Sequence, residues 1–248
     1  MRSVDKYNQL KNIILNAKKI VVITGAGISC PPPTSIKDFR SKDGLYSKGN
    51  KYNVPTEYLL SHEFFVENTK DFFEFYKDNF IYKDVPYNDA HKFFADLEKE
   101  KDVTIITQNI DGLHTKAGSK SVLELHGNSN RNYCTMCKKM YDLDEMDFSD
   151  IPICSCGGIV KPDVVLYGES LNGTLLSKAR DSIRNADTLI VVGSSLTVYP
   201  VAGFVKEFKG ENCIIINKQE TPFDEIADIV INDDIIDVIN KMKTNKKR

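Results

Sequence analysis

The sequence lacks the features that would place the protein in a membrane or on a nucleic acid. No run approaches the roughly 20 apolar residues that a membrane-spanning helix needs, and residues 1–5 show no apolar signal segment. A formal net charge of -2 gives no general affinity for nucleic acid. Internal repeats and low-complexity linkers are also absent. We therefore expect a soluble, cytoplasmic protein whose 248 residues can form one large domain with a smaller insertion.

Cysteine is sparse, with six residues, and four of them are clustered. Cys134 and Cys137 form one pair, Cys154 and Cys156 form a second, and residues 138–153 separate the pairs. In a reducing compartment such a cluster more often binds a metal than forms disulfides. Two thiolate pairs can complete a tetrahedral Zn²⁺ site with no open position, although the second pair is tighter than the common Cys-x-x-Cys. We predict one structural zinc ion that folds a segment poor in apolar residues.

Short apolar runs alternate with helical patterns along most of the chain. The predicted strands span residues 20–24, 103–107, 122–125, 189–192, 214–216 and 229–231, and the predicted helices span residues 6–18, 89–99, 175–185 and 201–208. Apolar runs of this kind are typical of buried strands in a parallel sheet. Their alternation with helices predicts an α/β fold in which helices cover both faces of a doubly wound parallel sheet.

Two stretches depart from this alternation. Residues 42–87 are rich in Phe and Tyr at mostly helical spacing, which predicts a small helical insertion whose aromatic side chains form a core or line an apolar channel. Residues 128–161 carry the cysteine cluster and predict a zinc-stapled module. The remaining residues, 1–41, 88–127 and 162–248, are then expected to form the large domain.

Polar or glycine-rich strings follow four of the predicted strands. Gly25, Ala26 and Gly27 follow the first run, and this turn suits either a bound diphosphate or a tight structural turn. The amide-rich residues 108–111 follow the second run, His126 follows the third, and a Gly-Ser-Ser string follows the fourth. Because the carboxyl ends of parallel strands meet at one edge of a sheet, where ligands bind, we expect these strings to share a cleft.

The histidines are interpreted by their positions. His126 stands at a strand end, where an imidazole that titrates near neutrality suits general-base work, although a lone histidine also occurs as a structural residue. His62 and His91 lie within helical patterns, and we interpret both as ordinary surface or packing residues.

Together these strings resemble the sirtuins, the NAD⁺-dependent protein lysine deacylases. The resemblance covers residues 17–235 and rests on residues 25–29, 38–41, 107–114, 125–127, 161–169 and 193–198 together with the four cysteines. It implies a Rossmann-type large domain that binds NAD⁺ and a small domain made of a helical insertion and a four-cysteine zinc ribbon. An acetyl-lysine peptide would enter the cleft between them, and the products would be free lysine, nicotinamide and O-acetyl-ADP-ribose.

The resemblance also implies roles for individual residues. His126 is the implied general base. The residues implied in NAD⁺ binding are Gly25, Ala26, Gly27, Phe39, Arg40, Gln108, Asn109, Ile110, Asp111, His126, Gly193, Ser194, Ser195 and Asn217, with Asp234 and Ile235 near the adenine end. Within that set, Asn109, Ile110 and Asp111 would surround the nicotinamide. Phe39 would cover the reacting ribose carbon, and the substrate contacts would be Phe39, Val164, Val165, Leu166 and Tyr167, whose backbone pairs with the peptide by strand addition.

One loop departs from the family pattern. The family usually has Gly-Ile-Pro before Asp-Phe-Arg, whereas this chain has Ser35, Ile36 and Lys37, after three prolines at residues 31–33. Prolines stiffen a segment toward an extended form, so we expect slower or weaker use of NAD⁺.

The acyl group and the reaction class leave alternatives. The desuccinylase branch of the family carries a Tyr-x-x-Arg pair, but residues 46–60 contain no arginine, which favours acetyl or a longer neutral acyl group. One alternative function is a protein ADP-ribosyltransferase. A general base at His126 argues against it, because the deacylation steps after nicotinamide loss use a base. A zinc-ribbon binding module that holds NAD⁺ only as a ligand is another, although the mixed charges of residues 131–150 form no basic face for nucleic acid. The expected partners are acetyl-lysine proteins or peptides.

Overall fold

The computed structural model describes residues 3–39, 41–47 and 49–244, and its largest element is a six-stranded parallel sheet. The strands lie in the order β3-β2-β1-β7-β8-β9. Their bounds are β1 Lys19–Thr24, β2 Asp102–Thr107, β3 Val122–Glu124, β7 Thr188–Val192, β8 Asn212–Ile216 and β9 Ile229–Ile231. The strand order reverses where β1 pairs with β7, with Ile20 beside Thr188. The predicted doubly wound parallel sheet is therefore confirmed.

Helices cover both faces of this sheet, as the buried strands require. The helices on one face are α1 Ser3–Asn16, α5 Asp89–Leu97 and α9 Ile235–Thr244, and on the other α7 Gly173–Arg184, α8 Val201–Phe204 and η4 Val205–Glu207. Val22 packs in the first cluster with Leu10 and Phe94, whereas Val21 packs in the second with Ile183. Successive side chains of a strand point to opposite faces, so a strand buried on both sides is apolar throughout.

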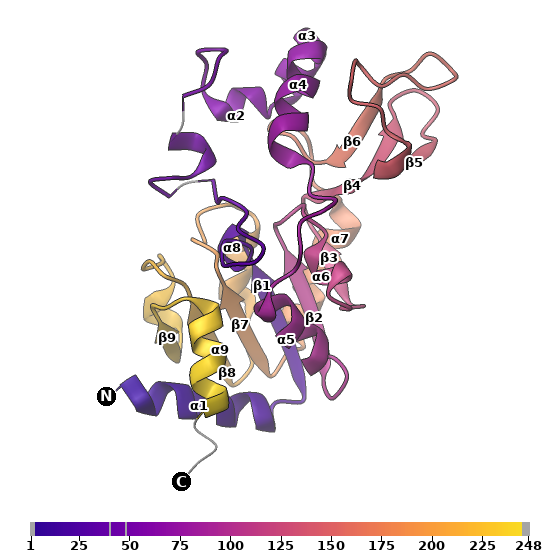
Figure 1. Cartoon of the computed structure of the whole chain (residues 1–248). Coiled ribbons are helices and arrows are strands. Elements are labelled where there is room, and N and C mark those ends of the chain that lie inside the picture. Colours follow the sequence, from indigo (N-terminus) through magenta and orange to yellow (C-terminus); the bar gives the residue numbers. More distant parts are fainter. Residues whose placement is uncertain (1–2, 40, 48, 245–248) are drawn as a thin grey trace.

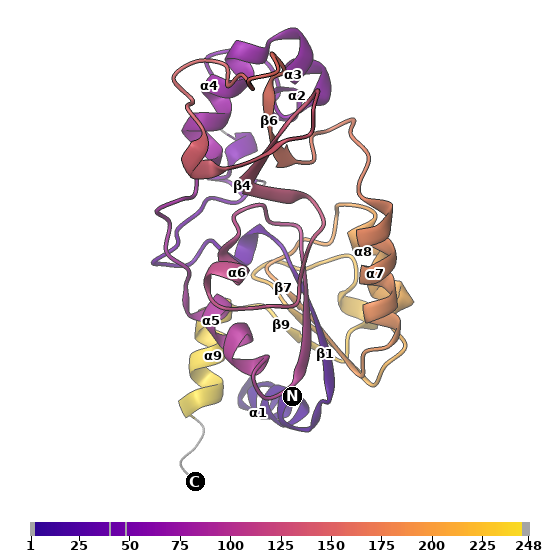
Figure 2. The ribbon, with the colours of Figure 1, turned by 90° about the vertical axis from the view of Figure 1, so that its right-hand side faces the viewer.

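A second, smaller part of the chain lies together at one end of the large sheet in both views (Figures 1 and 2). It contains a three-stranded antiparallel sheet in the order β5-β4-β6 and a group of short helices. The bounds are β4 Gly127–Cys134, β5 Met140–Asp142, η3 Leu143–Glu145, β6 Val160–Val164, η2 Leu45–Ser47, α2 Thr56–Leu59, α3 His62–Glu67 and α4 Thr69–Phe80. Phe64, Phe72, Phe73 and Tyr76 are buried there, so the aromatic side chains form a core as predicted.

Several element boundaries differ from the sequence prediction. The pattern over residues 201–208 is split into α8 and η4, because Gly203 and the β-branched residues around it favour a helix weakly. The aromatic insertion becomes regularly helical only from Thr56 onward. Three further short elements flank the cleft and the sheet, η1 Ala26–Ile28, α6 Leu113–Lys116 and η5 Asp224–Ile226. Among the helices of the described ranges, none combines the length and the apolar character that crossing a bilayer requires.

A candidate active site at the strand ends

A cavity of about 490 Å³ lies at the carboxyl ends of the large sheet's strands, where the strand order reverses. The predicted strings after four strands all line it, as do the residues that follow β8 and β6. The predicted site residues in its wall are Gly25, Ala26, Gly27, Phe39, Gln108, Asn109, Ile110, Asp111, His126, Val164, Val165, Leu166, Tyr167, Gly193, Ser194, Ser195 and Asn217. A crevice at this switch point is where open α/β sheets bind their ligands.

The glycine turn after β1 is packed against the loop after β7. A Cβ atom at Gly27 would lie 2.7 Å from the Gly193 Cα atom, so close packing of the two loops requires glycine there. The backbone N–H groups of Gly25 and Gly27 donate to the carbonyls of Val192 and Gly193, respectively. In this turn the Ala26 N–H has no partner among the residues that the structure describes. One donor of the turn is therefore available to a ligand.

His126 is held in one tautomer by the loop after β2. Its Nδ1 lies 2.9 Å from the backbone oxygen of Gln108, a carbonyl that can only accept, so Nδ1 carries the proton and donates. Burial lowers the pKa of His126 and outweighs that hydrogen bond, which acts in the opposite direction. The ring is thus neutral at neutral pH and its Nε2 carries a lone pair, as a general base requires.

The buried Asp111 and the half-buried Asn109 form a polar group beneath the glycine turn. The Ser29 hydroxyl donates to the Asp111 carboxylate at 2.7 Å, and the Asn109 amide donates to Ser29 at 3.2 Å and to the Gly25 carbonyl at 3.1 Å. Burial raises the pKa of Asp111. These bonds use both Asn109 N–H groups, so the Asp111 carboxyl is the group left to accept from a carboxamide ligand such as nicotinamide.

Two further histidines lie against this group, and one of them was interpreted only as a surface or packing residue. His91 is fully buried, as packing requires, but its Nε2 lies 3.4 Å from the Ser29 hydroxyl and its Nδ1 lies 2.9 Å from the Asn88 side chain. The His114 ring packs edge-on against the His91 ring, with the ring centres 4.9 Å apart, and its Nε2 lies 3.1 Å from the Thr24 hydroxyl. The sequence signal that could have shown His91 to be a polar contact residue is its spacing from Asn88, with which it forms a capping box at the start of α5.

Because both histidines are buried without a charged partner, we expect the protein to lose stability in mild acid. Burial lowers the pKa of His91 to about 4 and that of His114 well below its usual value. As the pH falls below about 6.5, the unfolded chain binds a proton that the folded chain does not. Each histidine should therefore lower the free energy of unfolding by about 1.4 kcal/mol per pH unit.

Urea unfolding of the wild type and of His91→Gln between pH 7 and pH 4.5 measures this effect. The variant should show a shallower decline with acid, because glutamine keeps a polar side chain at the site but has no proton to bind. Equal slopes for the two proteins would contradict the assignment.

Of the remaining predicted site residues, some line the cavity and others do not. Phe39 contacts Tyr46 edge-on at 5.5 Å and stacks on Phe80 at 6.3 Å, at the aromatic wall of the cavity. Arg40 lies outside the described residues. Asp234 and Ile235 do not line the cavity, although Asp234 is paired at 2.9 Å with Lys218, which does, and Ile235 is buried at the start of α9.

The departure from the family pattern before Asp38 has a local structural consequence. Ser35 stands where the family usually has glycine, and its φ of 53° is left-handed. Such a conformation costs a non-glycine residue about 1–2 kcal/mol. The loop is nevertheless tied back, because the Ile36 N–H donates to the Ser29 carbonyl at 3.0 Å.

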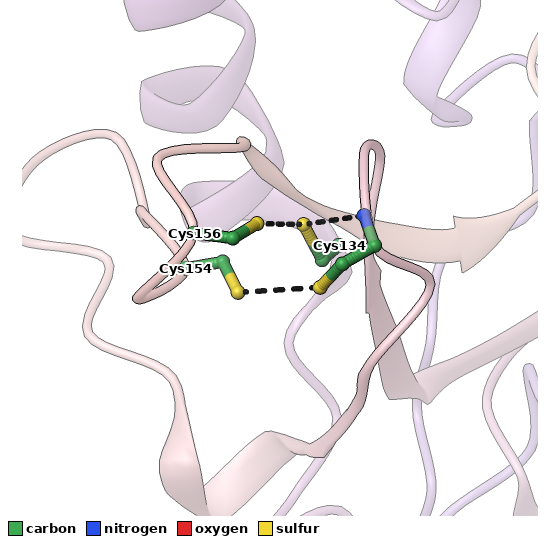
Figure 3. Close-up of side chains that lie close together, drawn as sticks. Cys134, Cys154 and Cys156 are labelled. Carbon is green, nitrogen blue, oxygen red and sulfur yellow. Dashed lines mark hydrogen bonds between the residues drawn. The ribbon is translucent and has the colours of Figure 1, made fainter.

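The four clustered cysteines converge at the end of β4 (Figure 3). Their sulfur atoms all lie within 4.8 Å of one another, with Cys134 and Cys156 at 3.4 Å and Cys137 and Cys154 at 3.7 Å. Four sulfurs bound to one zinc at about 2.3 Å would lie about 3.8 Å apart, so the set fits a tetrahedral zinc ion. Gly158 is required nearby, because a Cβ atom there would lie 2.7 Å from the Cys134 sulfur.

Fold and site together define an α/β protein of the nucleotide-binding class whose smaller part carries a four-cysteine cluster that fits a metal ion. The model of the Sir2 family matches residues 25–200. The NAD-dependent protein deacetylase of Clostridium acetobutylicum is 50% identical over 95% of this chain and 97% of its own. A solved structure of Sir2 with a p53 peptide and NAD⁺ superposes with a TM-score of 0.83 at 35% identity, covering 97% of this chain and 98% of that one. Another, with the inhibitor EX-527, 2′-O-acetyl-ADP-ribose and a deacetylated p53 peptide, gives 0.81 at 32% identity, covering 96% and 98%. The chain belongs to the Sir2 family.

Proposed function

We propose that this protein is an NAD-dependent protein lysine deacetylase that transfers the acetyl group of acetyl-lysine to ADP-ribose and releases nicotinamide. The relatives named NAD-dependent protein deacetylase, of which one is 50% identical, support this activity. The single observation that carries the mechanism is the neutral His126, oriented by the Gln108 carbonyl at the edge of a cleft with a carboxamide-binding group. NAD⁺, when bound, supplies the electrophilic ribose carbon and the acceptor hydroxyls.

The cofactor-binding roles are distributed over both sides of the switch point. The free N–H of Ala26 would donate to the diphosphate, and Ser194 and Ser195 would face it from the loop after β7. Asp111 would accept from the nicotinamide carboxamide N–H, and Asn109, whose two N–H groups bind Gly25 and Ser29, would hold the wall beside it. Phe39, on the aromatic wall, would cover the ribose carbon and exclude water, because hydrolysis there would waste the cofactor.

His126 would accept a proton through Nε2 from the ribose hydroxyls. NAD⁺, if bound, would supply that hydroxyl as the nucleophile, and the Gln108 carbonyl would stabilise the imidazolium that His126 forms when it takes the proton. Base chemistry of this kind is required for deacetylation and not for simple ADP-ribosyl transfer.

The substrate would bind along residues 164–168, which leave β6 and cross the cleft wall. The Val165 N–H donates to the His126 carbonyl at 2.9 Å, whereas the Val165 carbonyl accepts no hydrogen bond from any residue that the structure describes. An unpaired carbonyl beside the cleft suits strand addition by an extended peptide, a mode that depends little on side-chain sequence. The four cysteines would hold a structural zinc ion that fixes the sheet from which this segment emerges.

We expect the enzyme to prefer acetyl-lysine over succinyl-lysine peptides by about tenfold or more in kcat/KM. The proposed acyl wall is aromatic, with Phe39, Tyr76 and Phe80, and residues 46–60 contain no arginine. A buried succinyl carboxylate without a cation costs several kcal/mol. Matched peptides that differ only in the acyl group measure the ratio, and a preference for succinyl would contradict this assignment. A longer neutral acyl group remains compatible with it.

The place of action follows from the cysteines. None of the six cysteines is in a disulfide in the structure, which suits a reducing compartment, and we propose the cytoplasm.

Mass spectrometry of an acetyl-lysine peptide incubated with and without NAD⁺ tests the function. Loss of the acetyl group only with NAD⁺, with one nicotinamide released per acetyl group lost, is expected. Nicotinamide release from a peptide that stays acetylated would instead indicate ADP-ribosyl transfer or NAD⁺ hydrolysis.

A further inference from the structure

A buried lysine lies directly behind the proposed peptide-binding segment. The Lys161 side chain in β6 is only 3% exposed, and its Nζ donates to the backbone oxygens of Pro162 at 3.3 Å and Val164 at 2.8 Å. The ammonium also lies over the rings of Phe65 and Tyr133, at 5.9 Å and 5.7 Å. Burial of a charge is costly unless partners replace its lost hydration, so this lysine requires a specific ionic partner.

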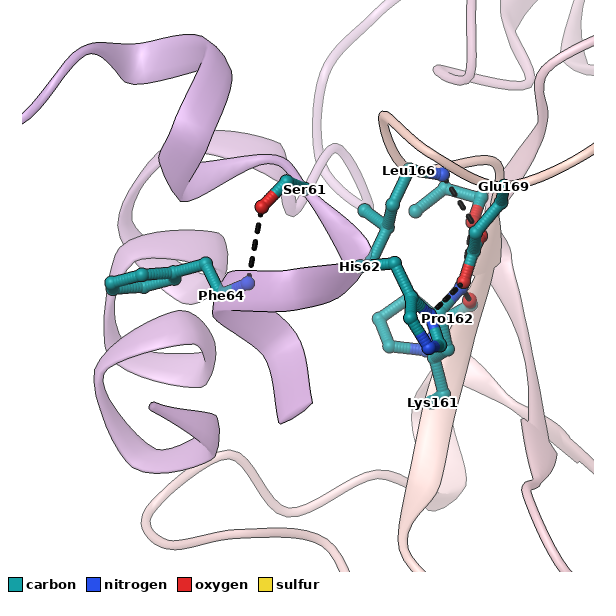
Figure 4. A network of polar contacts seen from close by, with 8 residues as sticks. Ser61, His62, Phe64, Lys161, Pro162, Leu166 and Glu169 are labelled. Atoms are coloured by element: carbon teal, nitrogen blue, oxygen red, sulfur yellow. Dashed lines mark hydrogen bonds and ion pairs between the residues drawn. The ribbon is translucent and has the colours of Figure 1, made fainter. Parts of the chain in front are cut away.

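That partner is Glu169, which closes the segment at its other end (Figure 4). One carboxylate oxygen lies 3.1 Å from Lys161 Nζ and also accepts the Leu166 N–H at 2.9 Å. The other oxygen lies 3.0 Å from Nδ1 of His62 at the start of α3. Burial alone would raise the pKa of Glu169, but the Leu166 N–H and the Lys161 charge outweigh it and lower the pKa. The carboxylate is therefore ionised at neutral pH.

The two residues of the ion pair thus both hydrogen-bond to the backbone of the segment. Lys161 holds the Val164 carbonyl and Glu169 holds the Leu166 N–H, one on each side of Val165. The Val165 N–H is used by the His126 carbonyl. The Val165 carbonyl has no partner among the described residues, and Val165 lines the cleft.

We propose that Lys161 and Glu169 are positioning residues for the acetyl-lysine peptide. Their ion pair fixes the backbone on both sides of Val165, so that its free carbonyl is presented to the peptide at a set distance from His126. The inference rests on the proposed function and extends it to residues that act through the backbone. Lys161 does not line the cleft, so its effect on the peptide passes through the segment, whereas Glu169 also forms part of the cavity wall.

Steady-state kinetics of Lys161→Met and Glu169→Gln test the proposal. Each variant leaves one buried charge unpaired and loosens the segment, so the KM for acetyl-peptide should rise about tenfold. The kcat and the KM for NAD⁺ should stay within about twofold, because the cofactor-binding loops after β1, β2 and β7 are untouched. Lys209→Met, a change at an exposed lysine, is the matched control and should change nothing.

The double variant Lys161→Met/Glu169→Gln separates positioning from folding. It leaves no unpaired buried charge, so it should unfold at a higher temperature than either single variant while keeping the raised KM for peptide. If a single variant fails to fold, the KM for peptide is measured on the double variant instead.

An unchanged peptide KM in the folded variants, or equal losses for peptide and NAD⁺, would overturn the positioning role. Anisotropy of a fluorescent acetyl-lysine peptide gives a reading independent of turnover. If the wild type fails to deacetylate but binds this peptide, the proposed function fails, while the variants' weaker binding still supports the positioning role. Peptide binding by the variants equal to that of the wild type would contradict the positioning role.

Discussion

Replacement of His126 by alanine should lower kcat/KM for an acetyl-lysine peptide by about 10²–10⁴-fold, the usual contribution of a general base. The Gln108 carbonyl fixes the proton on Nδ1, so Nε2 is the only ring nitrogen that can accept one. No other neutral histidine lines the cavity among the described residues, because His91 and His114 lie behind its wall. The proposed base therefore has no substitute among these residues.

The pH dependence of the wild type provides a second reading of the same residue. A base works when it is unprotonated, and burial lowers the pKa of His126 below its usual value of about 6.5. Activity should thus persist below that pH and fall only as the pH drops through the lowered pKa. The pH range must be corrected for unfolding, which the buried His91 and His114 promote in acid.

The His126→Ala protein itself should remain folded and should retain NAD⁺ binding, since the loops after β1 and β7 are held by their own backbone hydrogen bonds. Titration of NAD⁺ by calorimetry and thermal unfolding are the controls. A variant that binds NAD⁺ normally and deacetylates at the wild-type rate would remove His126 from the mechanism.

The second large effect is expected at the cysteine cluster. Cys134→Ser should abolish zinc binding and deacetylation together, because Cys134 ends β4 and its sulfur lies among the other three. A structural zinc contributes about 10 kcal/mol or more to the folding of small metal modules. Without it the sheet β5-β4-β6 should not form, and the peptide segment that leaves β6 would lose its anchor.

Cys213→Ala is the matched control for this loss. Cys213 is buried among apolar side chains in β8 of the six-stranded sheet, whereas Cys134 ends β4 of the three-stranded sheet. The Cys213→Ala protein should therefore keep both zinc and activity. Elemental analysis counts the zinc, and circular dichroism should show that the six-stranded sheet persists in Cys134→Ser. Full activity in a zinc-free protein would contradict the structural role.

The fold was largely predictable from the sequence for a simple physical reason. Strands buried on both faces must be apolar throughout, and the runs at β1, β2, β7 and β8 are therefore visible as continuous patterns. The boundaries were less certain. The run after residue 121 continues to Leu125, but β3 ends at Glu124, where the chain turns toward His126.

The site was predictable only where its residues follow strand ends. His126 and Asn109 satisfy that condition, whereas His91 reaches Ser29 from a helix that begins at Asp89, and only the folded chain brings them together. The burial of Lys161 is still harder to predict, because a lysine in a strand ordinarily indicates an exposed position. Its burial depends on Glu169, which returns to it from beyond the end of β6.

The most direct test of the central claim is the fate of the acetyl group itself. A peptide carrying an isotopically labelled acetyl-lysine is incubated with the protein and NAD⁺, and the small-molecule products are weighed by mass spectrometry. Transfer to the cofactor predicts that the label appears in O-acetyl-ADP-ribose, in equal amount to the nicotinamide released. Label recovered as free acetate from the first turnover, with unmodified ADP-ribose beside it, would contradict the account.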